Sequence, residues 1–395
     1  MRPFEGIRVI DVTHVLAGPF AAYQLALLGA DVIKVEDPND PDQSRTSGSD
    51  KALNRARMGT GFLTQASNKR AITADLKTDA GREIIRRLVK TADVFVENYR
   101  PGAFASLGLG YEALASINPR LIYASFSAFG QDGPKAERTA YDNVIQATSG
   151  LMAMTGTETV HPVKLGSPVV DYATGTMGAF ALSAALFQRE RTGRGQRIDM
   201  AMLDVAMILM ASHLTGYLRN GVQPRPHGNR QPYSTNSTYA TKDGTLLMLG
   251  ASNLRQQRRL WNVLERPDMA KASDDEREAD RAREDAVLAE ILATRTAAEW
   301  EEYLQARHVP AGRVRTMAEA AADPQLAARA VLHRHAGAPG VDGPFGVPVA
   351  AFKFAHDGPR VDAPPPALGQ HNDEVLAELG YSAAEIARLR AERVI

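Results

Sequence analysis

The sequence contains no cysteine among its 395 residues, which excludes disulfide bonds, thiolate nucleophiles and cysteine-ligated metal sites. Lys and Arg number 46, as do Asp and Glu, so no net charge draws the chain to nucleic acid or to an anionic membrane. The first residues lack the apolar region of a signal peptide. The longest apolar stretch, around 177–187, is shorter than the ~20 residues of a membrane helix. We therefore expect a cytoplasmic protein that binds neither nucleic acid nor a membrane.

Several catalytic and cofactor-binding motifs are also missing. The chain has no G-x-G-x-x-G or phosphate-loop pattern, which argues against a nicotinamide dehydrogenase. It has no G-x-S-x-G motif, which argues against an α/β-hydrolase. The nine histidines show no H-E-x-x-H or other metal-binding spacing. We therefore expect no metal site.

The first 200 residues alternate short β-like runs with helical stretches. Residues 7–12 are typical of a buried strand, Gly18-Pro19 ends this run, and a helix is expected to about Leu28. A second strand is expected at 31–36. This order predicts a βαβ unit with two parallel strands.

The same alternation continues to about residue 191. Thr78 is placed to cap a helix that runs to Ala92, and strands are expected at 94–96 and 121–126. A further strand is expected to end at Val169-Val170, and Asp171 is expected to open an Ala-rich helix. The prediction is therefore an α/β fold with a doubly wound, Rossmann-like parallel sheet.

The second half of the chain has a different organisation. Residues 236–249 are typical of β structure with a turn at Asp243-Gly244, and helical patterns follow. A Pro- and Gly-rich stretch from 337 to 368 indicates an extended connection. We therefore predict a large domain over 1–200, a linker at 201–224, a smaller α+β domain at 225–325, a return linker at 326–365 and closing helices at 366–395.

Four segments carry candidate functional side chains near the expected strand ends, where open α/β sheets bind ligands. They are His14 to Pro19, Asn98 to Arg100, Arg138 to Asn143, and Asp171. From its position, Asp171 is either a helix N-cap or a carboxylate nucleophile kept ionised by the helix dipole, and the two roles are compatible. Arg100 is either solvated or a phosphate partner.

Taken in order, the segments of this chain resemble the class III coenzyme A transferases, the CaiB/BaiF family. The likeness covers nearly the whole chain, with residues 225–365 matching least. The matching segments are Gly6 to Asp11, Ala17 to Pro19, Leu28 to Glu36, Asn68 to Arg70, Ala74 to Lys77, Asp93 to Gly102, Gly130 to Pro134, Tyr141-Asp142, Thr192 to Gln196, and Leu368 to Asn372.

The resemblance implies a particular architecture. A Rossmann-like large domain is built from 1–200 and completed by 366–395, with the smaller domain between two linkers. Two chains interlock as a homodimer, which makes folding inseparable from association.

The resemblance also implies the reaction. Asp171 stands where the family has its catalytic aspartate, which carries CoA from an acyl-CoA donor to a free carboxylic acid through an aspartyl anhydride and an aspartyl-CoA thioester. CoA is a substrate, and no metal or permanently bound cofactor is expected. The residues that the resemblance assigns to CoA are His14, Leu16, Ala17, Ala74, Asp75, Leu76, Lys77, Asn98, Tyr99, Arg100, Tyr141 and Asp142.

At three places the chain departs from the family pattern, and these departures bear on which substrates are expected. Leu16 replaces the glutamine of formyl-CoA:oxalate transferases, the glycine-rich loop of those enzymes is not evident, and Asp37 replaces an arginine that contacts adenosine. These departures weaken an oxalate assignment. A small dicarboxylate pair, such as succinyl-CoA with another diacid, is the favoured alternative.

Two other functions stay open at this point. One is an α-methylacyl-CoA racemase, which carries a histidine where this chain has Tyr141, a poor base at neutral pH. The other is a CoA-binding protein without catalytic activity.

Overall fold

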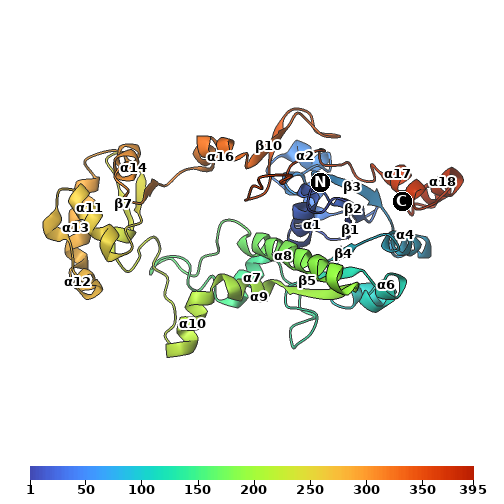
Figure 1. Ribbon diagram of the computed structural model, residues 1–395, viewed down its shortest axis with the longest axis horizontal. Helices are drawn as coiled ribbons and strands as arrows, with labels where there is room; N and C mark the ends of the chain where they lie inside the picture. Colours follow the sequence, from blue (N-terminus) through green and yellow to red (C-terminus); the bar gives the residue numbers. More distant parts are fainter. The chain divides into compact units, whose positions relative to one another are not determined.

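The computed structural model describes residues 1–395. Its internal contacts divide the chain into two units (Figure 1). Unit 1 comprises Met1–Leu151, Lys164–Val222 and Leu326–Ile395, and unit 2 comprises Met152–Val163 and Gln223–Gln325.

Unit 1 is built on a sheet of six parallel strands in the order β3-β2-β1-β4-β5-β6. This is the strand order of the doubly wound dinucleotide-binding fold. The predicted α/β class with a parallel sheet is therefore confirmed. The strands are β1 (Arg8–Asp11), β2 (Asp31–Glu36), β3 (Lys69–Thr73), β4 (Val94–Glu97), β5 (Ile122–Ser127) and β6 (Gln196–Ala201).

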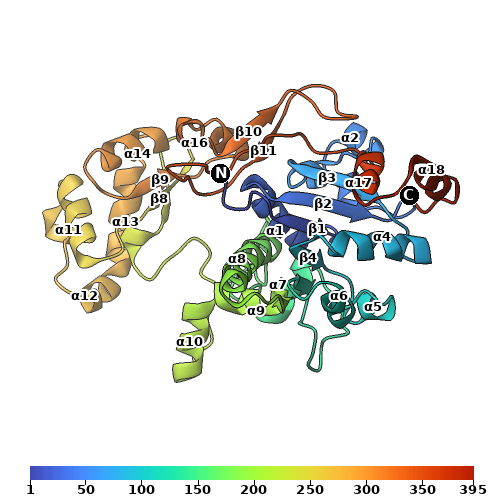
Figure 2. The ribbon, with the colours of Figure 1, turned by 45° about the vertical axis from the view of Figure 1, so that its right-hand side comes forward.

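Neighbouring residues along each strand supply two different apolar layers. Val9 and Val32 belong to the core under helices α1 (Ala17–Leu27) and α8 (Val169–Thr192), whereas Ile10 and Ile33 belong to the opposite core. The second core is closed by helices from both ends of the chain, α4 (Asp79–Val89), α17 (Asn372–Glu378) and α18 (Ala383–Ala391) (Figure 2). Side chains alternate across a strand, so one run of apolar residues fills both layers.

Short helices and one hairpin complete unit 1. They are η1 (Gln43–Thr46), α2 (Lys51–Arg55), α3 (Thr60–Leu63), α5 (Ala103–Ser106), α6 (Tyr111–Ile117), α7 (Asp142–Ser149), α9 (Met202–Leu209), α10 (Ala211–Asn220), α16 (Pro324–Arg329, which begins in unit 2), β10 (Leu332–His335) and β11 (Phe345–Pro348). The predicted cap of α4 is confirmed, because the Thr78 hydroxyl accepts the Gly81 amide at 3.0 Å.

Three local predictions are wrong. Val169-Val170 begin helix α8 instead of ending a strand, and the sixth strand is β6. The stretch 201–224, expected to be a linker, contains α9 and α10, and the return stretch contains β11 paired with β10. Apolar runs of this length fit a helix or a strand equally well, so only packing decides between them.

Helix α8 is also longer than its apolar run suggests. By length and composition alone it is able to cross a membrane, so the prediction that no stretch approaches that length is wrong. In this structure its central part packs on α1 and β5, and 39% of its apolar window is buried. Near its C-terminal end, buried Arg189 pairs with Asp93 at 2.9 Å.

Unit 2 has its own core. A three-stranded antiparallel sheet in the order β7-β8-β9 packs against helices through Trp261, Leu288 and Trp300. The predicted β structure around the Asp243-Gly244 turn is confirmed. The elements are η2 (Ser234–Asn236), β7 (Thr238–Ala240), β8 (Leu246–Leu249), α11 (Leu254–Val263), η3 (Pro267–Met269), α12 (Asp274–Ala279), α13 (Arg281–Leu292), α14 (Ala297–Gln305), β9 (Ala311–Arg313) and α15 (Met317–Ala321).

The close packing of α8 on α1 gives a testable prediction. A Cβ at Gly175 would lie 2.7 Å from the Ala17 carbonyl oxygen, so Gly175→Ala forces the helices apart and should destabilise the protein by about 1–3 kcal/mol in urea unfolding. The matched control is Gly216→Ala in α10, where nothing lies within 4 Å of the new methyl group. This control should be neutral or stabilising by up to about 1 kcal/mol. Equal effects of the two substitutions would contradict the packing argument.

Candidate active site

The site lies at the carboxyl ends of β1 and β4. These strands are neighbours at the point where the strand order reverses, which is where doubly wound sheets open a crevice for ligands. The loops that follow them are tied together. The His14 amide donates to Asn98 Oδ1 at 2.9 Å, and Asn98 Nδ2 donates to the His14 carbonyl at 2.8 Å.

A cavity of about 400 Å³ opens at this point. It brings together Asp171 and seven of the residues that the resemblance assigns to CoA. Those seven are His14, Leu16, Ala17, Asn98, Tyr99, Arg100 and Tyr141. Residues from three separate segments of the chain, 14–17, 98–100 and Tyr141, therefore converge on one carboxylate.

A second cavity of about 520 Å³ shares Asn98, Tyr99, Arg100 and Tyr141 with the first. Arg138 lines this second cavity, and neither Arg100 nor Arg138 forms an ion pair with a carboxylate of this chain. Both guanidinium groups are exposed. The cavity therefore offers two free cations to an anionic ligand.

A third, smaller pocket of about 120 Å³ lies between the ends of β2 and β3. Ala74, Leu76 and Lys77 line it, together with Tyr99, which also lines the two larger cavities. The Lys77 ammonium pairs with Asp37 at 3.2 Å. An anion that reaches Lys77 must therefore compete with Asp37 for its charge.

Two residues assigned to CoA do not line these cavities. Asp75 forms the turn before α4, where its carboxylate accepts the Lys77 amide at 2.9 Å. Asp142 is buried, and its Oδ2 accepts the amides of Val170 at 2.8 Å and Asp171 at 3.1 Å. Asp142 thus satisfies the free N–H groups at the start of α8, a role that the sequence suggested for Asp171.

Asp171 itself lies inside the first turn of α8, where Pro168 is the N-cap. Burial raises the pKa of the Asp171 carboxyl to about 7, and the nearby negative charge of Asp142 contributes in the same direction. The expectation that the helix terminus keeps this group fully ionised is therefore wrong. Asp142 takes the terminal amides, and desolvation then outweighs the helix dipole.

Helix α1 presents the opposite case, because its N-terminus has no side-chain cap and no acidic residue in the first turn. The carbonyl of Leu16 accepts the Phe20 amide at 2.8 Å, whereas the amides of Leu16, Ala17 and Gly18 have no acceptor within the chain. Leu16 and Ala17 line the cavity that holds Asp171. The cavity thus combines a carboxylate with free amide donors at a helix N-terminus, where negative charge is stabilised.

The His14 side chain is held as a neutral ring. Its Nε2 lies 2.8 Å from the Tyr99 hydroxyl, and burial together with the Lys34 charge lowers the pKa of His14 below its usual range. Burial raises the pKa of Tyr99 to about 12. Both groups are therefore uncharged at neutral pH and suit hydrogen bonding more than proton transfer.

Sequence reasoning missed several lining residues. They are Asp40, Pro41, Gln43, Phe126, Ser127, Ala128 and Met202. The Phe126–Ser127 pair follows the rule that ligands bind beyond strand ends, because β5 ends at Ser127. No sequence signal marks the others. No group of three or more His, Asp or Glu side chains is arranged to hold a metal ion.

Comparisons with known proteins identify the family of this chain. The family model described as CoA-transferase family III matches residues 4–372. A succinate–glutarate CoA-transferase of Agrobacterium fabrum is 39% identical over 394 residues, covering 95% of this chain and 96% of that protein. A human succinyl-CoA:glutarate CoA-transferase is 35% identical, covering 100% of this chain and 90% of its own.

A solved structure gives the same result for the fold. The crystal structure of a CAIB/BAIF family protein from Brucella suis superposes with a TM-score of 0.83 at 35% identity, and covers 96% of this chain and 99% of its own. The predicted family and activity are confirmed. This chain belongs to CoA-transferase family III and is an enzyme that transfers coenzyme A between an acyl-CoA and a carboxylic acid.

Proposed function

We propose that this enzyme transfers CoA from a small dicarboxylic acyl-CoA, such as succinyl-CoA, to a second small diacid, with Asp171 as the covalent nucleophile. The observation that carries the mechanism is the pairing of the Asp171 carboxylate with the open N-terminus of α1 in one cavity. The choice of diacids is supported by the names of the Agrobacterium and human relatives. Leu16, in place of glutamine, argues against oxalate.

The reaction then proceeds in four acyl-transfer steps. The Asp171 carboxylate attacks the thioester carbonyl, the C–S bond breaks, and CoA thiolate leaves a mixed anhydride. The thiolate attacks the aspartyl carbonyl and expels the donor acid, which leaves an aspartyl-CoA thioester. The acceptor carboxylate attacks this thioester and expels CoA thiolate, and the thiolate finally attacks the acceptor carbonyl and frees Asp171.

None of these steps moves a proton, so the site needs no general acid or base. This requirement fits the neutral His14–Tyr99 pair and the position of Tyr141 in the cavity. Each step instead builds negative charge on a carbonyl oxygen. The free amides of Leu16, Ala17 and Gly18 supply donors for these oxyanions, and a preorganised donor of this kind contributes about 10²–10³-fold to kcat.

The second cavity, which Arg100 and Arg138 line, suits the part of CoA beyond the thioester. We propose that Arg100 and Arg138 bind its phosphates, because both are exposed and unpaired. The small pocket of Ala74, Leu76 and Lys77 then takes the other end of the nucleotide. In this proposal no permanently bound cofactor takes part in the reaction. The cytoplasmic location remains a prediction from the sequence.

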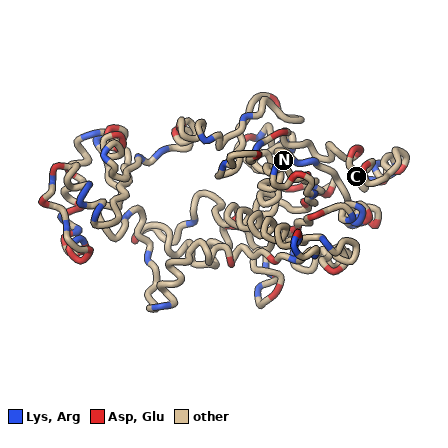
Figure 3. The backbone as a smooth tube through the Cα atoms, viewed as in Figure 1, with Lys and Arg blue, Asp and Glu red and all other residues tan.

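We further propose that the enzyme is a homodimer. Met177, Phe180, Ala184 and Phe187 form one apolar stripe on α8 that unit 1 leaves exposed. Phe180 is 68% and Phe187 62% exposed, and α9 adds Ile208 at 65%. No charged residue lies between Asp171 and Arg189, and this part of the tube carries no charge colours (Figure 3). Exposed apolar side chains gathered on one helix face are typical of a surface that another chain covers.

The covalent role of Asp171 is tested by substitution and trapping. Asp171→Ala should abolish transfer from succinyl-CoA to glutarate while the far-UV CD spectrum is unchanged. In wild-type enzyme, succinyl-CoA plus hydroxylamine should inactivate the protein and leave a hydroxamate at Asp171 in peptide mass spectra. A hydroxamate on another residue, or full turnover by the variant, would overturn the role.

The raised pKa of Asp171 gives a pH prediction. Only the carboxylate attacks, so kcat/KM should rise with pH through about 7 and level off above it. Asp142→Asn removes the neighbouring charge and should move this limb to lower pH, measured from initial rates at low substrate concentration. A wild-type limb near the ordinary aspartate value, or one that is unaffected by Asp142→Asn, would contradict the assignment.

The homodimer is tested by light scattering. The wild-type mass should be twice the 42.7 kDa of the chain, and the double variant Phe180→Asp, Phe187→Asp should lose the dimer. Phe354→Asp, at a half-exposed phenylalanine outside α8, is the control and should remain dimeric. A monomeric wild-type enzyme would exclude the proposal.

A further inference from the structure

The loop between β1 and α1 contains an unfavourable backbone conformation. Val15 has φ 67°, in the left-handed region, and is the only β-branched residue of the chain with a positive φ. A left-handed β-branched residue persists only where its surroundings determine it. Val15 lies directly before Leu16, the N-cap of α1, and lines the cavity that holds Asp171.

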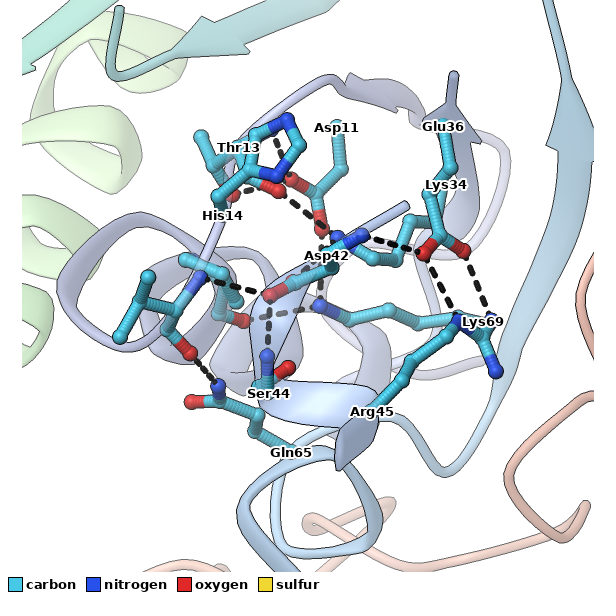
Figure 4. Close-up of polar contacts among 12 residues, drawn as sticks. Asp11, Thr13, His14, Lys34, Glu36, Asp42, Ser44, Arg45, Gln65 and Lys69 are labelled. Atoms are coloured by element: carbon cyan, nitrogen blue, oxygen red, sulfur yellow. Dashed lines mark hydrogen bonds and ion pairs between the residues drawn. The ribbon is translucent and has the colours of Figure 1, made fainter. Parts of the chain in front are cut away.

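Buried side chains hold this loop residue by residue (Figure 4). The Lys34 ammonium donates to the Thr13 carbonyl at 2.7 Å. Asp42 Oδ1 accepts the Val15 amide at 2.9 Å, and the Gln65 side-chain amide donates to the Val15 carbonyl. Both backbone polar groups of the strained residue are therefore satisfied by side chains that come from outside the loop.

Asp42 and Lys34 act as one unit. They form an ion pair at 3.0 Å, and their side chains are 1% and 2% exposed. Burial opposes the charge of Asp42, yet the Lys34 ammonium and the amides of Val15 and Ser44 hold the pKa of Asp42 below its ordinary value. Asp42 is thus a fixed acceptor at neutral pH.

The pair is embedded in a larger buried network of side chains from β1, β2, β3 and η1. Glu36 forms two bonds to Arg45, at 2.8 and 2.7 Å, and also accepts the Asp42 amide at 3.2 Å. Lys69 pairs with Asp11 at 2.8 Å and donates to the Pro19 carbonyl in α1 at 2.8 Å. Cations and anions alternate, so no buried charge is left uncompensated, and each acidic group is fixed in position.

Such a network is a poor device for stability alone, because the cost of taking each ion out of water offsets much of the attraction within a pair. Neither Asp42 nor Lys34 lines the cavities around Asp171. What they contact is the backbone of the loop that ends at the free amides of α1. The function that fits this geometry is to fix the direction of those amides.

We propose that Asp42, paired with Lys34, is a positioning residue that holds Val15 in its left-handed conformation and thereby aims the Leu16, Ala17 and Gly18 amides at the oxyanions formed at Asp171. This inference rests on the proposed function, because it takes these amides as the oxyanion donors. It adds that their alignment depends on an ion pair that does not touch the substrate.

The test is a double-mutant cycle on CoA transfer, with the acyl-CoA and acid that the wild-type enzyme turns over best. Asp42→Ala should lower kcat by about 10²-fold and change KM less than about 3-fold, because the amides act mainly in the transition state. In the Val15→Gly background, where glycine adopts the left-handed conformation without strain, the same substitution should lower kcat less than about 10-fold.

The expected partial rescue separates positioning from a general loss of stability. Equal losses of kcat in the two backgrounds, or wild-type kcat in Asp42→Ala, would overturn the proposal. If Asp42→Ala does not fold, Asp42→Asn replaces it in the same cycle. This variant keeps an acceptor for Val15 but loses the ion pair with Lys34. Equal losses of kcat in the wild-type and Val15→Gly backgrounds would again overturn the proposal.

The matched control is the ion pair of partly exposed Asp93 with buried Arg189, which lies at the opposite end of the sheet, before β4. Asp93→Asn should lower the melting temperature but leave kcat within about 2-fold of wild type. A loss of kcat in this control as large as that in Asp42→Ala would show that the effect is not positional. Failure of hydroxylamine trapping at Asp171 would instead reject the proposed nucleophile, while the cycle would still report on the loop.

Discussion

The close approach of α8 to α1 is the contact on which the active site depends. It is possible because Gly175 has no side chain to meet the Ala17 carbonyl, and it brings the first turns of two helices to the same edge of the sheet. Asp171 lies in the first turn of one helix and the free amides in the first turn of the other. The proposed nucleophile and the proposed oxyanion donors therefore come from two elements about 150 residues apart in sequence, which meet at the contact of Gly175 with Ala17.

The N-terminal amides of α8 have a side-chain acceptor, whereas those of α1 have none, and this difference suits the proposed reaction. Asp142 occupies the amides of α8, so Asp171 gains little from the dipole of its own helix and has a raised pKa. A carboxylate that is not fully satisfied in the free enzyme is more ready to form a bond. The amides of α1 are left without a cap, so their stabilisation is available to the charge that develops on the substrate.

The loop that leads into α1 contains features that lower the stability of the folded protein. Placing Val15 in the left-handed region costs about 1–2 kcal/mol, and burying the surrounding ions adds desolvation. Proteins keep such features where geometry matters more than stability. The ion pair of Asp42 with Lys34 has no contact with the cavity, yet it contacts the loop at the residue that bears the strain.

The sequence by itself determined the local elements and the family. Strand β2, the cap of α4 and the βαβ order follow from apolar patterns and a capping threonine, because these signals act within a few residues. The ordered motifs also singled out Asp171 as the candidate nucleophile. The tertiary structure alone decided that Val169 begins a helix, that Asp142 accepts the first amides of α8, and that a buried ion network supports the first loop. These features depend on burial and on contacts between distant segments, for which a linear pattern carries no signal.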